Sequence, residues 1–505
     1  MAFDGDGWRI DGFDESPPDD LAARIWKRDA SVWGPGDDDP ADRLGWLDLP
    51  DTIRGEIAPV EAFVRDTGVY MDKVVLLGMG GSSLAPEVFA TCFGARTGYP
   101  QLVVLDSTHP GQIEPVAEEL VGTNNLFVVS SKSGGTIETT SLYAYFRARS
   151  DDARNFAAIT DPGTSLEQLA SDEGFGGVFL NPPDVGGRYS ALSLFGLVPA
   201  ALCGVDLDAL LEPAAAMAAA CGPSVPPDEN PGLVLGWALG RLAQGGRDKL
   251  TFVTSPGLAP FGDWVEQLIA ESTGKHGVGI VPVVGEPPLD TYGEDRVFVH
   301  LRLEDDELPK PPSGHPVIRL DVRGPEELGA QMFLWEFATA VASAALGINA
   351  FDQPDVEAAK KAARAALESD EEPDWTEDDV DALFAGAAPG DYAAFLAFAP
   401  RTVETTETLD AARAKVARSQ GIATTAGVGP RYLHSTGQLH KGGPDSVRAV
   451  VILDAPESET GIPGQPYDFG HLLRAQATGD YEALKSAGKK VARTTWSRFE
   501  EWART

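Results

Sequence analysis

Residues 73–86 read KVVLLGMGGSSLAP, a run of aliphatic residues followed by a glycine turn and the start of a helical sequence. A strand that is apolar on both faces is typical of a parallel sheet covered by helices on each side. Similar apolar runs follow at 101–106, 125–131 and 156–160, each next to helix-forming sequence. This part of the chain therefore predicts an α/β domain built on a parallel sheet.

The rest of the chain repeats this alternation of strand and helix. After the proline-rich segment PSVPPDENP, a second block contains four strand-like runs and a long helix, at 250–255, 279–284, 296–301, 316–322 and 325–346. A third block contains strand-like runs at 393–399, 421–427 and 448–455, followed by a helical tail through Trp502. We predict an N-terminal extension at 1–45, a first sheet domain at 46–205, a second at 225–360 and a C-terminal α/β portion at 361–505.

The charge of the chain argues against two classes of partner. Lys and Arg number 40 against 77 Asp and Glu, which gives a formal net charge of −37. Such a chain repels the phosphates of nucleic acids and of anionic lipids, so we expect no nucleic-acid partner and no membrane partner. The excess of acidic residues also fits a surface adapted to high salt, which we keep as a hypothesis.

Cysteine usage and the N-terminal sequence favour the cytoplasm. The three cysteines form no CxxC pair, which argues against a disulfide framework or a structural zinc site. The first residues, MAFDGDGWRIDGF, lack the basic start and the apolar core of a signal peptide. The longest apolar stretch, 333–351, contains Glu336 and predicts a buried helix rather than a membrane span. We therefore expect a cytoplasmic protein.

The segment GMGGSS at 78–83 is the first of two loops suited to a phosphate. Glycines let the backbone approach an anion, and the helix that follows presents unpaired N–H groups. The segment nearly matches the dinucleotide pattern GxGxxG, with Ser83 in place of the last glycine, and Asp106 ends the next strand. A dinucleotide-binding enzyme therefore stays an alternative, as does a tight turn that binds nothing.

The second loop, SSKSGGTIET at 130–139, is richer in hydroxyl groups. Hydroxyls and backbone N–H groups suit the three terminal oxygens of a phosphate monoester, and helix dipoles aimed at the anion favour it further. Two such loops at the carboxyl ends of neighbouring parallel strands lie where open α/β sheets usually bind a ligand. No GxxxxGK[ST] motif occurs, which disfavours ATP chemistry. The predicted phosphate ligands are Gly80, Gly81, Ser82, Ser131, Lys132, Ser133 and Thr136.

The two loops resemble the phosphate loops of glucose-6-phosphate isomerases, which have the sugar-isomerase (SIS) fold. Four later segments resemble motifs of the same family in the same order: GGRYSALSLFG at 186–196, ESTGK at 271–275, GINAFDQPDVEAAK at 347–360 and GPRYLHSTGQLHKGG at 429–443. The last segment is similar to the branch of the family that is fused to transaldolase. Because this sequence has no room for a transaldolase barrel, we expect the isomerase half alone.

The resemblance implies two SIS-type (flavodoxin-like) three-layer αβα domains with parallel sheets, plus the C-terminal α/β portion. It implies reversible isomerisation of glucose 6-phosphate and fructose 6-phosphate through a cis-enediolate, with a hexose 6-phosphate as substrate and with no metal and no organic cofactor. It also implies a homodimer, although the additional C-terminal material leaves a monomer open. Two alternatives remain, an isomerase that also accepts mannose 6-phosphate and a non-catalytic sugar-phosphate sensor.

The resemblance assigns roles to individual side chains. Glu271 is the predicted base that moves a proton between C1 and C2, and Arg188 is predicted to stabilise the enediolate. Lys360 is predicted to help open the sugar ring and Gln353 to contact the substrate. These two residues are seven apart, so they can share one face of a helix. Asp355 departs from the family motif, because it replaces a glycine.

The motifs do not fix the histidine that opens the ring in this family. His434 is the first candidate, because its segment is rich in polar residues. His300, His315 and His440 are alternatives, and Gln331 stands where one branch of the family carries its histidine.

Overall fold

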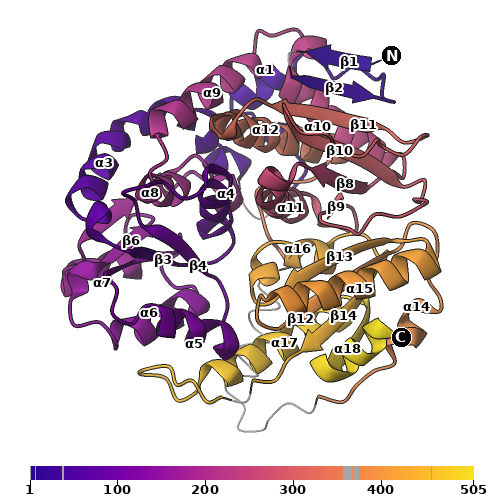
Figure 1. The fold of residues 1–505 in the computed structure, drawn as a ribbon. Coiled ribbons are helices and arrows are strands. Elements are labelled where there is room, and N and C mark those ends of the chain that lie inside the picture. Colours follow the sequence, from indigo (N-terminus) through magenta and orange to yellow (C-terminus); the bar gives the residue numbers. More distant parts are fainter. Residues whose placement is uncertain (1, 6, 37–38, 356–366, 368–374, 457) are drawn as a thin grey trace.

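The computed structural model describes residues 2–5, 7–36, 39–355, 367, 375–456 and 458–505. Within these residues the chain forms three β-sheets, each packed against helices (Figure 1). The predicted fold class, α/β with parallel sheets, is confirmed. We call the sheets first, second and third, in the order in which their parallel strands follow one another along the chain. The predicted domain boundaries stay predictions.

The first sheet is parallel throughout, in the order β4-β3-β5-β6-β7. Its strands are β3 (Lys73–Gly78), β4 (Gln101–Leu105), β5 (Asn125–Ser130), β6 (Phe156–Thr160) and β7 (Gly177–Leu180). This is the flavodoxin-like order 2-1-3-4-5, in which a ligand binds between the first and third strands. Gly78 pairs with Ser130 in register, so both predicted phosphate loops leave the sheet side by side at that position.

Alternate side chains of the first sheet face opposite helical layers. Val74 belongs to the core formed with α4 (Leu84–Phe93) and α8 (Leu194–Leu202), whereas Val75 belongs to the core formed with α6 (Ile137–Arg147). This alternation explains why the strands are apolar at nearly every position. Helices α1 (Leu21–Trp26), α2 (Leu49–Thr52) and α3 (Ile57–Asp66) precede the first strand of this sheet in the sequence. Helices α5 (Pro110–Glu119) and α7 (Ser165–Glu173) connect strands of the sheet.

The second sheet has the order β1-β2-β11-β10-β8-β9. Its strands are β1 (Ala2–Gly5), β2 (Trp8–Asp11), β8 (Lys249–Thr254), β9 (Val281–Val283), β10 (Arg296–Leu303) and β11 (Val317–Val322). The last four are parallel, whereas the N-terminal hairpin β1–β2 extends the edge in the antiparallel direction through β11. The N-terminal region thus adds strands to a sheet that is formed much later in the sequence.

Helix α12 (Leu328–Leu346) is the centre of the second-sheet region. It packs against α9 (Leu207–Ala220), α10 (Pro231–Gln244) and α11 (Ala259–Thr273), and it is buried along most of its length. The predicted buried helix is therefore confirmed. It ends at Gly347, whose φ of +72° is the left-handed conformation that glycine adopts without strain, and the chain then turns into the segment that contains FDQ.

The third sheet is parallel, in the order β13-β12-β14-β15. Its strands are β12 (Tyr392–Phe398), β13 (Ala423–Val428), β14 (Val447–Leu453) and β15 (Lys490–Thr495). Its order, 2-1-3-4, repeats that of the first sheet. The helical tail predicted through Trp502 is wrong in one respect, because β15 interrupts it and pairs with β14. The helices here are α14 (Val380–Phe384), α15 (Val403–Gln420), α16 (Gly437–Gly442), α17 (Phe469–Ser486) and α18 (Trp496–Arg504).

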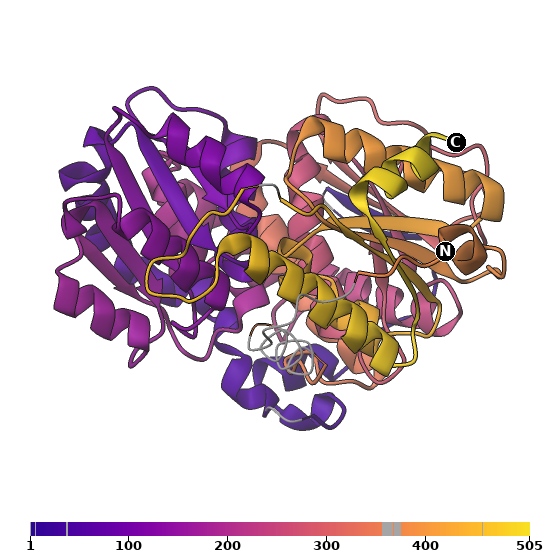
Figure 2. The ribbon, with the colours of Figure 1, turned by 90° about the horizontal axis from the view of Figure 1, so that it is seen from below.

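Helix α17 connects the first-sheet region to the third sheet (Figure 2). Phe469 packs edge to face on Tyr145 of α6, with ring centroids 5.7 Å apart, and Leu472 belongs to the same core. Further along the helix, Leu473 and Ala477 belong to the core of the third sheet. One helix therefore holds two cores together by apolar contacts.

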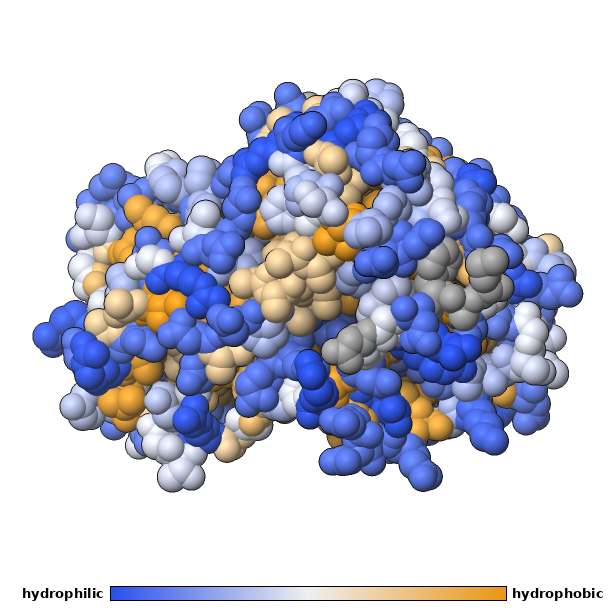
Figure 3. Space-filling view, turned by 90° about the horizontal axis from the view of Figure 1, so that it is seen from above, coloured by the Kyte–Doolittle hydropathy of each residue, from blue (hydrophilic) through white to orange (hydrophobic). Residues whose placement is uncertain are grey.

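The face of the molecule drawn in Figure 3 is largely hydrophilic, with apolar residues scattered over it. Near the centre of this view, a group of moderately apolar residues is bordered by hydrophilic ones. In the part of the chain that the structure describes, no helix combines the length and the hydropathy needed to cross a bilayer.

Candidate active site

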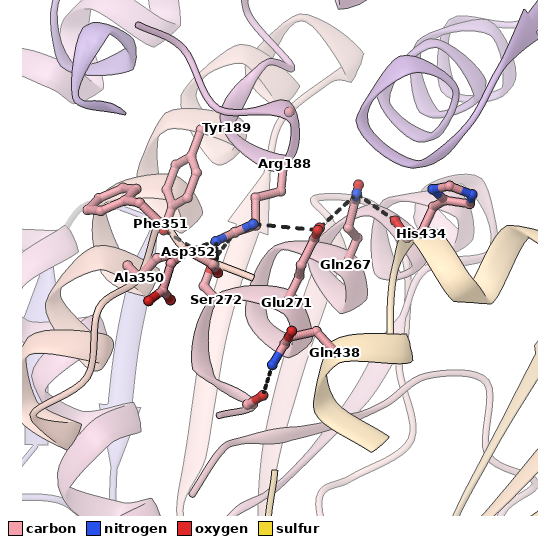
Figure 4. A network of polar contacts seen from close by, with 12 residues as sticks. Arg188, Tyr189, Gln267, Glu271, Ser272, Ala350, Phe351, Asp352, His434 and Gln438 are labelled. Atoms are coloured by element: carbon pink, nitrogen blue, oxygen red, sulfur yellow. Dashed lines mark hydrogen bonds and ion pairs between the residues drawn. The ribbon is translucent and has the colours of Figure 1, made fainter. Parts of the chain in front are cut away.

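Residues from all three sheet regions surround a cavity of about 740 Å³. The cavity lies at the carboxyl ends of β3 and β5, where the strand order predicts a ligand. The residues that line this cavity and form the candidate site are Gly80, Gly81, Ser82, Lys132, Ser133, Thr136, Glu138, Arg188, Gln267, Glu271, Gln353, His434, Lys441, Gln476 and Asp480. Figure 4 shows the part of the site around Glu271.

The glycines of the first loop are required for close packing. A Cβ at Gly80, whose φ is +55°, would lie 2.5 Å from the carbonyl oxygen of His434. A Cβ at Gly81 would lie 2.0 Å from the carbonyl oxygen of Gly187. The loop can therefore touch the arginine segment and the histidine segment only because it lacks side chains at these positions.

The second loop brings hydroxyl groups to the N-terminal end of α6. Ser133 and Thr136 line the cavity, and Thr136 is the residue that precedes the first turn of the helix. Ser131, in contrast, lies behind the wall, where its Oγ is 2.9 Å from Oγ1 of Thr136. Lys132 lines the cavity and binds Asp161. Six of the seven predicted phosphate ligands therefore meet at one wall, at a helix end that favours an anion.

Glu271 lies in the last turn of α11 and is 7% exposed. Its Oε2 accepts a hydrogen bond of 3.1 Å from Nε2 of Gln267, one helical turn earlier (Figure 4). Its Oε1 lies 3.5 Å from Nη1 of Arg188. Gln267 also donates to the carbonyl oxygen of His434 at 2.8 Å. The carboxylate is thus oriented at the cavity wall by one amide and one guanidinium.

Arg188 is held by two other motifs. Its Nε donates to Oγ of Ser272 at 2.8 Å, and its Nη2 donates to the carbonyl oxygens of Ala350 and Asp352 at 2.5 and 3.2 Å. The segments GGRYS, ESTGK and FDQ, which are far apart in the sequence, therefore meet at one guanidinium (Figure 4). A planar fork with several donors is suited to such a junction, which a lysine could not reproduce.

Lys275, the last residue of ESTGK, anchors the FDQ segment. Its Nζ donates to the carbonyl oxygens of Asn349 and Asp352 at 2.8 and 2.7 Å, and to the carboxylate of Asp352 at 2.8 Å. Burial lowers the pKa of Lys275 to about 8, and the charge of Arg188 acts in the same direction, although Asp352 opposes both. The segment that leads to Gln353 is therefore fixed against the end of α11.

His434 enters the cavity from the third-sheet region and is paired with an acid. Its Nε2 lies 2.9 Å from Oε1 of Glu138, and the same oxygen accepts a hydrogen bond of 2.7 Å from Nε2 of Gln476. Oγ1 of Thr108 donates to Oε1 of Gln476 at 2.8 Å, which sets the orientation of the amide. A carboxylate acceptor at Nε2 selects the tautomer that carries its proton there, with Nδ1 as the acceptor.

The other candidate histidines lie away from the cavity. The structure describes all seven histidines of the chain, and only His434 lines the cavity. Burial lowers the pKa of His300, in β10, to about 4, and that of His440 to about 3. His315 is also absent from the cavity wall. The geometry therefore favours His434 among the candidates, and its catalytic role stays a prediction.

The lysine motif is described only in part. Gln353 lines the cavity, whereas Lys360 lies outside the described residues. Asp355, which replaces the glycine of the motif, accepts a hydrogen bond of 2.6 Å from Nε2 of Gln438, and its N–H donates to Oε1 of Gln438 at 3.1 Å. Gln438 also donates to the carbonyl oxygen of Gly274 at 2.9 Å. The unusual aspartate thus ties the end of the FDQ segment to α16.

Asp106 is the residue whose position left a dinucleotide-binding site as an alternative. In the structure its carboxylate binds other side chains of the protein. It is buried at the end of β4, where Arg431 donates to it at 2.5 Å and Ser83 at 3.3 Å. Arg431 also binds Glu87; burial opposes ionisation of Glu87, but Arg431 and Arg401 hold its pKa near 2. A dinucleotide site would present this carboxylate to a ribose hydroxyl. The geometry therefore argues against that alternative.

Replacing Arg431 with methionine is expected to reduce the free energy of unfolding by about 3–5 kcal/mol, because Asp106 and Glu87 would lose a buried partner. His434 follows in the same turn, so its position should loosen as well. Urea unfolding measures the effect, with Arg65→Met as the control, since the Arg65 side chain is 68% exposed. Equal unfolding midpoints for the two variants would contradict the assigned role of Arg431.

Five of the cavity residues named above were not predicted from the sequence: Glu138, Gln267, Lys441, Gln476 and Asp480. Glu138 stands two residues after Thr136 in the first turn of α6, and Gln267 stands one helical turn before Glu271. Helical spacing from a predicted site residue could have indicated both of them. Gln476 could not have been found in this way, because it belongs to α17, which is distant in sequence from both loops.

The fold and this cavity define an α/β protein that presents phosphate-type loops to a buried Glu–Arg pair. The family model for phosphoglucose isomerase matches residues 54–279, which include both loops, Arg188 and Glu271. A glucose-6-phosphate isomerase from Symbiobacterium thermophilum is 31% identical over 401 residues, covering 66% of this chain and 88% of that protein. One from Citrifermentans bemidjiense is 30% identical over 384 residues, covering 63% and 72%. The chain belongs to the phosphoglucose isomerase family.

Solved structures agree on the fold. A hypothetical protein from Thermus thermophilus is 27% identical with a TM-score of 0.59, covering 69% of this chain and 94% of that chain. A glucose-6-phosphate isomerase from Chlamydia trachomatis is 20% identical with a TM-score of 0.52, covering 71% and 80%. The second likeness concerns the fold alone.

Proposed function

We propose that this chain interconverts glucose 6-phosphate and fructose 6-phosphate by moving a proton between C1 and C2. The observation that carries the proposal is the pair of Glu271 and Arg188, 3.5 Å apart, on the wall of a cavity that also contains both loops. Family membership supports the same reaction.

The loops bind the phosphate through backbone N–H and hydroxyl groups, and this remote contact orients the reacting carbons. Glu271 removes the proton from C2 of the open-chain aldose and delivers it to C1, while a proton passes from O2 to O1, so the carbonyl group moves from C1 to C2. Because one carboxylate serves both carbons from one face, the intermediate is a cis-enediolate. Arg188 balances the negative charge that develops on its oxygens.

Ring opening is assigned to His434, with Glu138 as the residue that positions it. Lys360 is proposed to assist, as the family motif implies, and Gln353 to contact the sugar. His434→Gln is expected to slow turnover of cyclic glucose 6-phosphate about 10²-fold or more, because Nδ1 of the imidazole takes the proton of the C1 hydroxyl and the imidazolium so formed delivers a proton to the ring oxygen. Glu138→Gln should act on the same step, because a neutral amide does not stabilise the imidazolium as the carboxylate does, and its NH₂ group can compete with its oxygen for Nε2.

Exchange between the α and β anomers of glucose 6-phosphate, followed by NMR, isolates ring opening from isomerisation. Both variants should slow this exchange, and His440→Gln, which lies off the cavity, serves as the matched control. Anomer exchange at the wild-type rate in His434→Gln would remove His434 from the mechanism.

A coupled assay tests the reaction itself, with fructose 6-phosphate supplied and glucose 6-phosphate detected. Mannose 6-phosphate assayed in parallel decides whether the enzyme also isomerises that sugar. Binding of fructose 6-phosphate without formation of glucose 6-phosphate would overturn the proposal in favour of a sugar-phosphate sensor. A thermal shift with NAD(P) would revive the dinucleotide alternative.

The proposal places the enzyme in the cytoplasm, in keeping with its three cysteines, none of which forms a disulfide. We propose a homodimer, as the family resemblance implies, with a monomer as the alternative. Light scattering at assay concentration distinguishes the two states.

A further inference from the structure

Lys441 lies on the cavity wall and has no role in the mechanism above. Its side chain, on α16, is 4% exposed, and its Nζ lies 2.5 Å from Oδ1 of Asp480 and donates to the carbonyl oxygen of Gly437 at 3.3 Å. Asp480, on α17, also lines the cavity and accepts a hydrogen bond of 2.7 Å from the hydroxyl of Tyr432. Burial raises the pKa of Tyr432, and Asp480 raises it further, so the phenol keeps the proton that it donates.

An ion pair at this position is poorly explained by stability alone. Removing both charges from water costs about as much as their attraction returns, so apolar side chains of similar volume would close the wall equally well. Leu433 and Leu472 do line the same cavity. The placement of a charged pair beside them indicates a ligand group that uses it.

The chemistry of the pair suits a hydroxyl group. An ammonium has three N–H donors, and among the described residues Asp480 and Gly437 account for two of them. Asp480 cancels the charge of Lys441, which makes the pair a poor site for a phosphate dianion. The pair nevertheless offers a donor beside an acceptor, and a sugar hydroxyl can be both acceptor and donor.

We propose that Lys441, oriented by Asp480, donates a hydrogen bond to a hydroxyl group of the hexose and is a specificity-determining residue for the sugar part of the substrate. This inference rests on the proposed function, in which the loops of the first-sheet region take the phosphate. The third-sheet region then contributes sugar recognition as well as the candidate histidine.

Two ligands separate the two ends of the site. Sorbitol 6-phosphate is an unreactive open-chain hexitol phosphate, and inorganic phosphate represents the charged end alone. In Lys441→Met, the Kd of sorbitol 6-phosphate measured by calorimetry is expected to rise about ten- to a hundredfold, as for loss of a hydrogen bond to a charged group. The Kd of inorganic phosphate should change by less than about twofold.

Lys489→Met is the matched control. The Lys489 side chain is also 4% exposed, and its Nζ binds Asp445 at 2.6 Å and donates to the carbonyl oxygen of Gly443 at 2.7 Å, but it does not line the cavity. This variant should bind both ligands as the wild type does. If Lys441→Met does not fold, the double variant Lys441→Met/Asp480→Leu removes both charges together and leaves no unpaired buried carboxylate.

Unchanged binding of sorbitol 6-phosphate by a folded Lys441→Met or double variant would overturn the inference. An equal loss for inorganic phosphate would also overturn it, because the effect would then be a general collapse of the site. Failure of the proposed function would be seen separately, as a wild type that forms no glucose 6-phosphate from fructose 6-phosphate.

Discussion

Replacing Glu271 with glutamine is expected to lower kcat about 10²- to 10⁴-fold and to keep the fold. The amide has the shape of the carboxylate and stays beside Gln267 and Arg188, but it cannot accept a proton from carbon. Initial rates at saturating fructose 6-phosphate measure the loss, and thermal melting shows whether the fold is kept.

Glu266→Gln is the matched control on the same helix. Burial raises the pKa of Glu266 to about 8, with the charge of Asp263 acting in the same direction, so at neutral pH the side chain is mostly a neutral acid that glutamine resembles. Glu266 does not line the cavity. Its variant should retain wild-type turnover, whereas near wild-type turnover of Glu271→Gln would reject Glu271 as the base.

Replacing Arg188 with alanine is expected to lower kcat about 10²- to 10³-fold, the usual cost of losing a group that stabilises an oxyanion. The KM should change much less, because the phosphate loops are untouched. Ser272 and the carbonyl oxygens of Ala350 and Asp352 would lose their donor, so a lower melting temperature is expected as well.

Steady-state kinetics separate these effects. A folded Arg188→Ala variant that still binds sorbitol 6-phosphate with near wild-type affinity, but turns over slowly, supports the assigned role. A variant with wild-type kcat and a raised KM would show that Arg188 binds the substrate rather than stabilising the enediolate.

The local part of the fold was predictable because its signals are local. The runs at 73–78 and 125–131 became β3 and β5, since continuous apolar sequence reports burial on both faces. The short strands β7 and β15 were missed. β15 contains two charged residues and has an alternating burial pattern, so it lacks the continuous apolar run of β3 and β5. Its pairing with β14 is a contact between separate segments, which no local sequence pattern predicts.

The contacts between segments that are far apart in the sequence could not be predicted from the sequence. The hairpin of β1 and β2 joins the second sheet through β11, which requires knowledge of contacts between distant segments. Likewise, Arg188 could be assigned from its motif, but its attachment to Ala350 could not. Asp106, whose position had left a dinucleotide site as an alternative, pairs with Arg431 from the third-sheet region, and no local pattern indicates this contact.

A crystal structure of Glu271→Gln with bound fructose 6-phosphate tests the central claim most directly, because the variant holds the substrate without converting it. The account predicts the phosphate within hydrogen-bond distance of the loops at 80–82 and 131–136, with C1 and C2 about 3–3.5 Å from the side chain at position 271. A phosphate bound away from those loops, or C1 and C2 beyond the reach of that side chain, would contradict it.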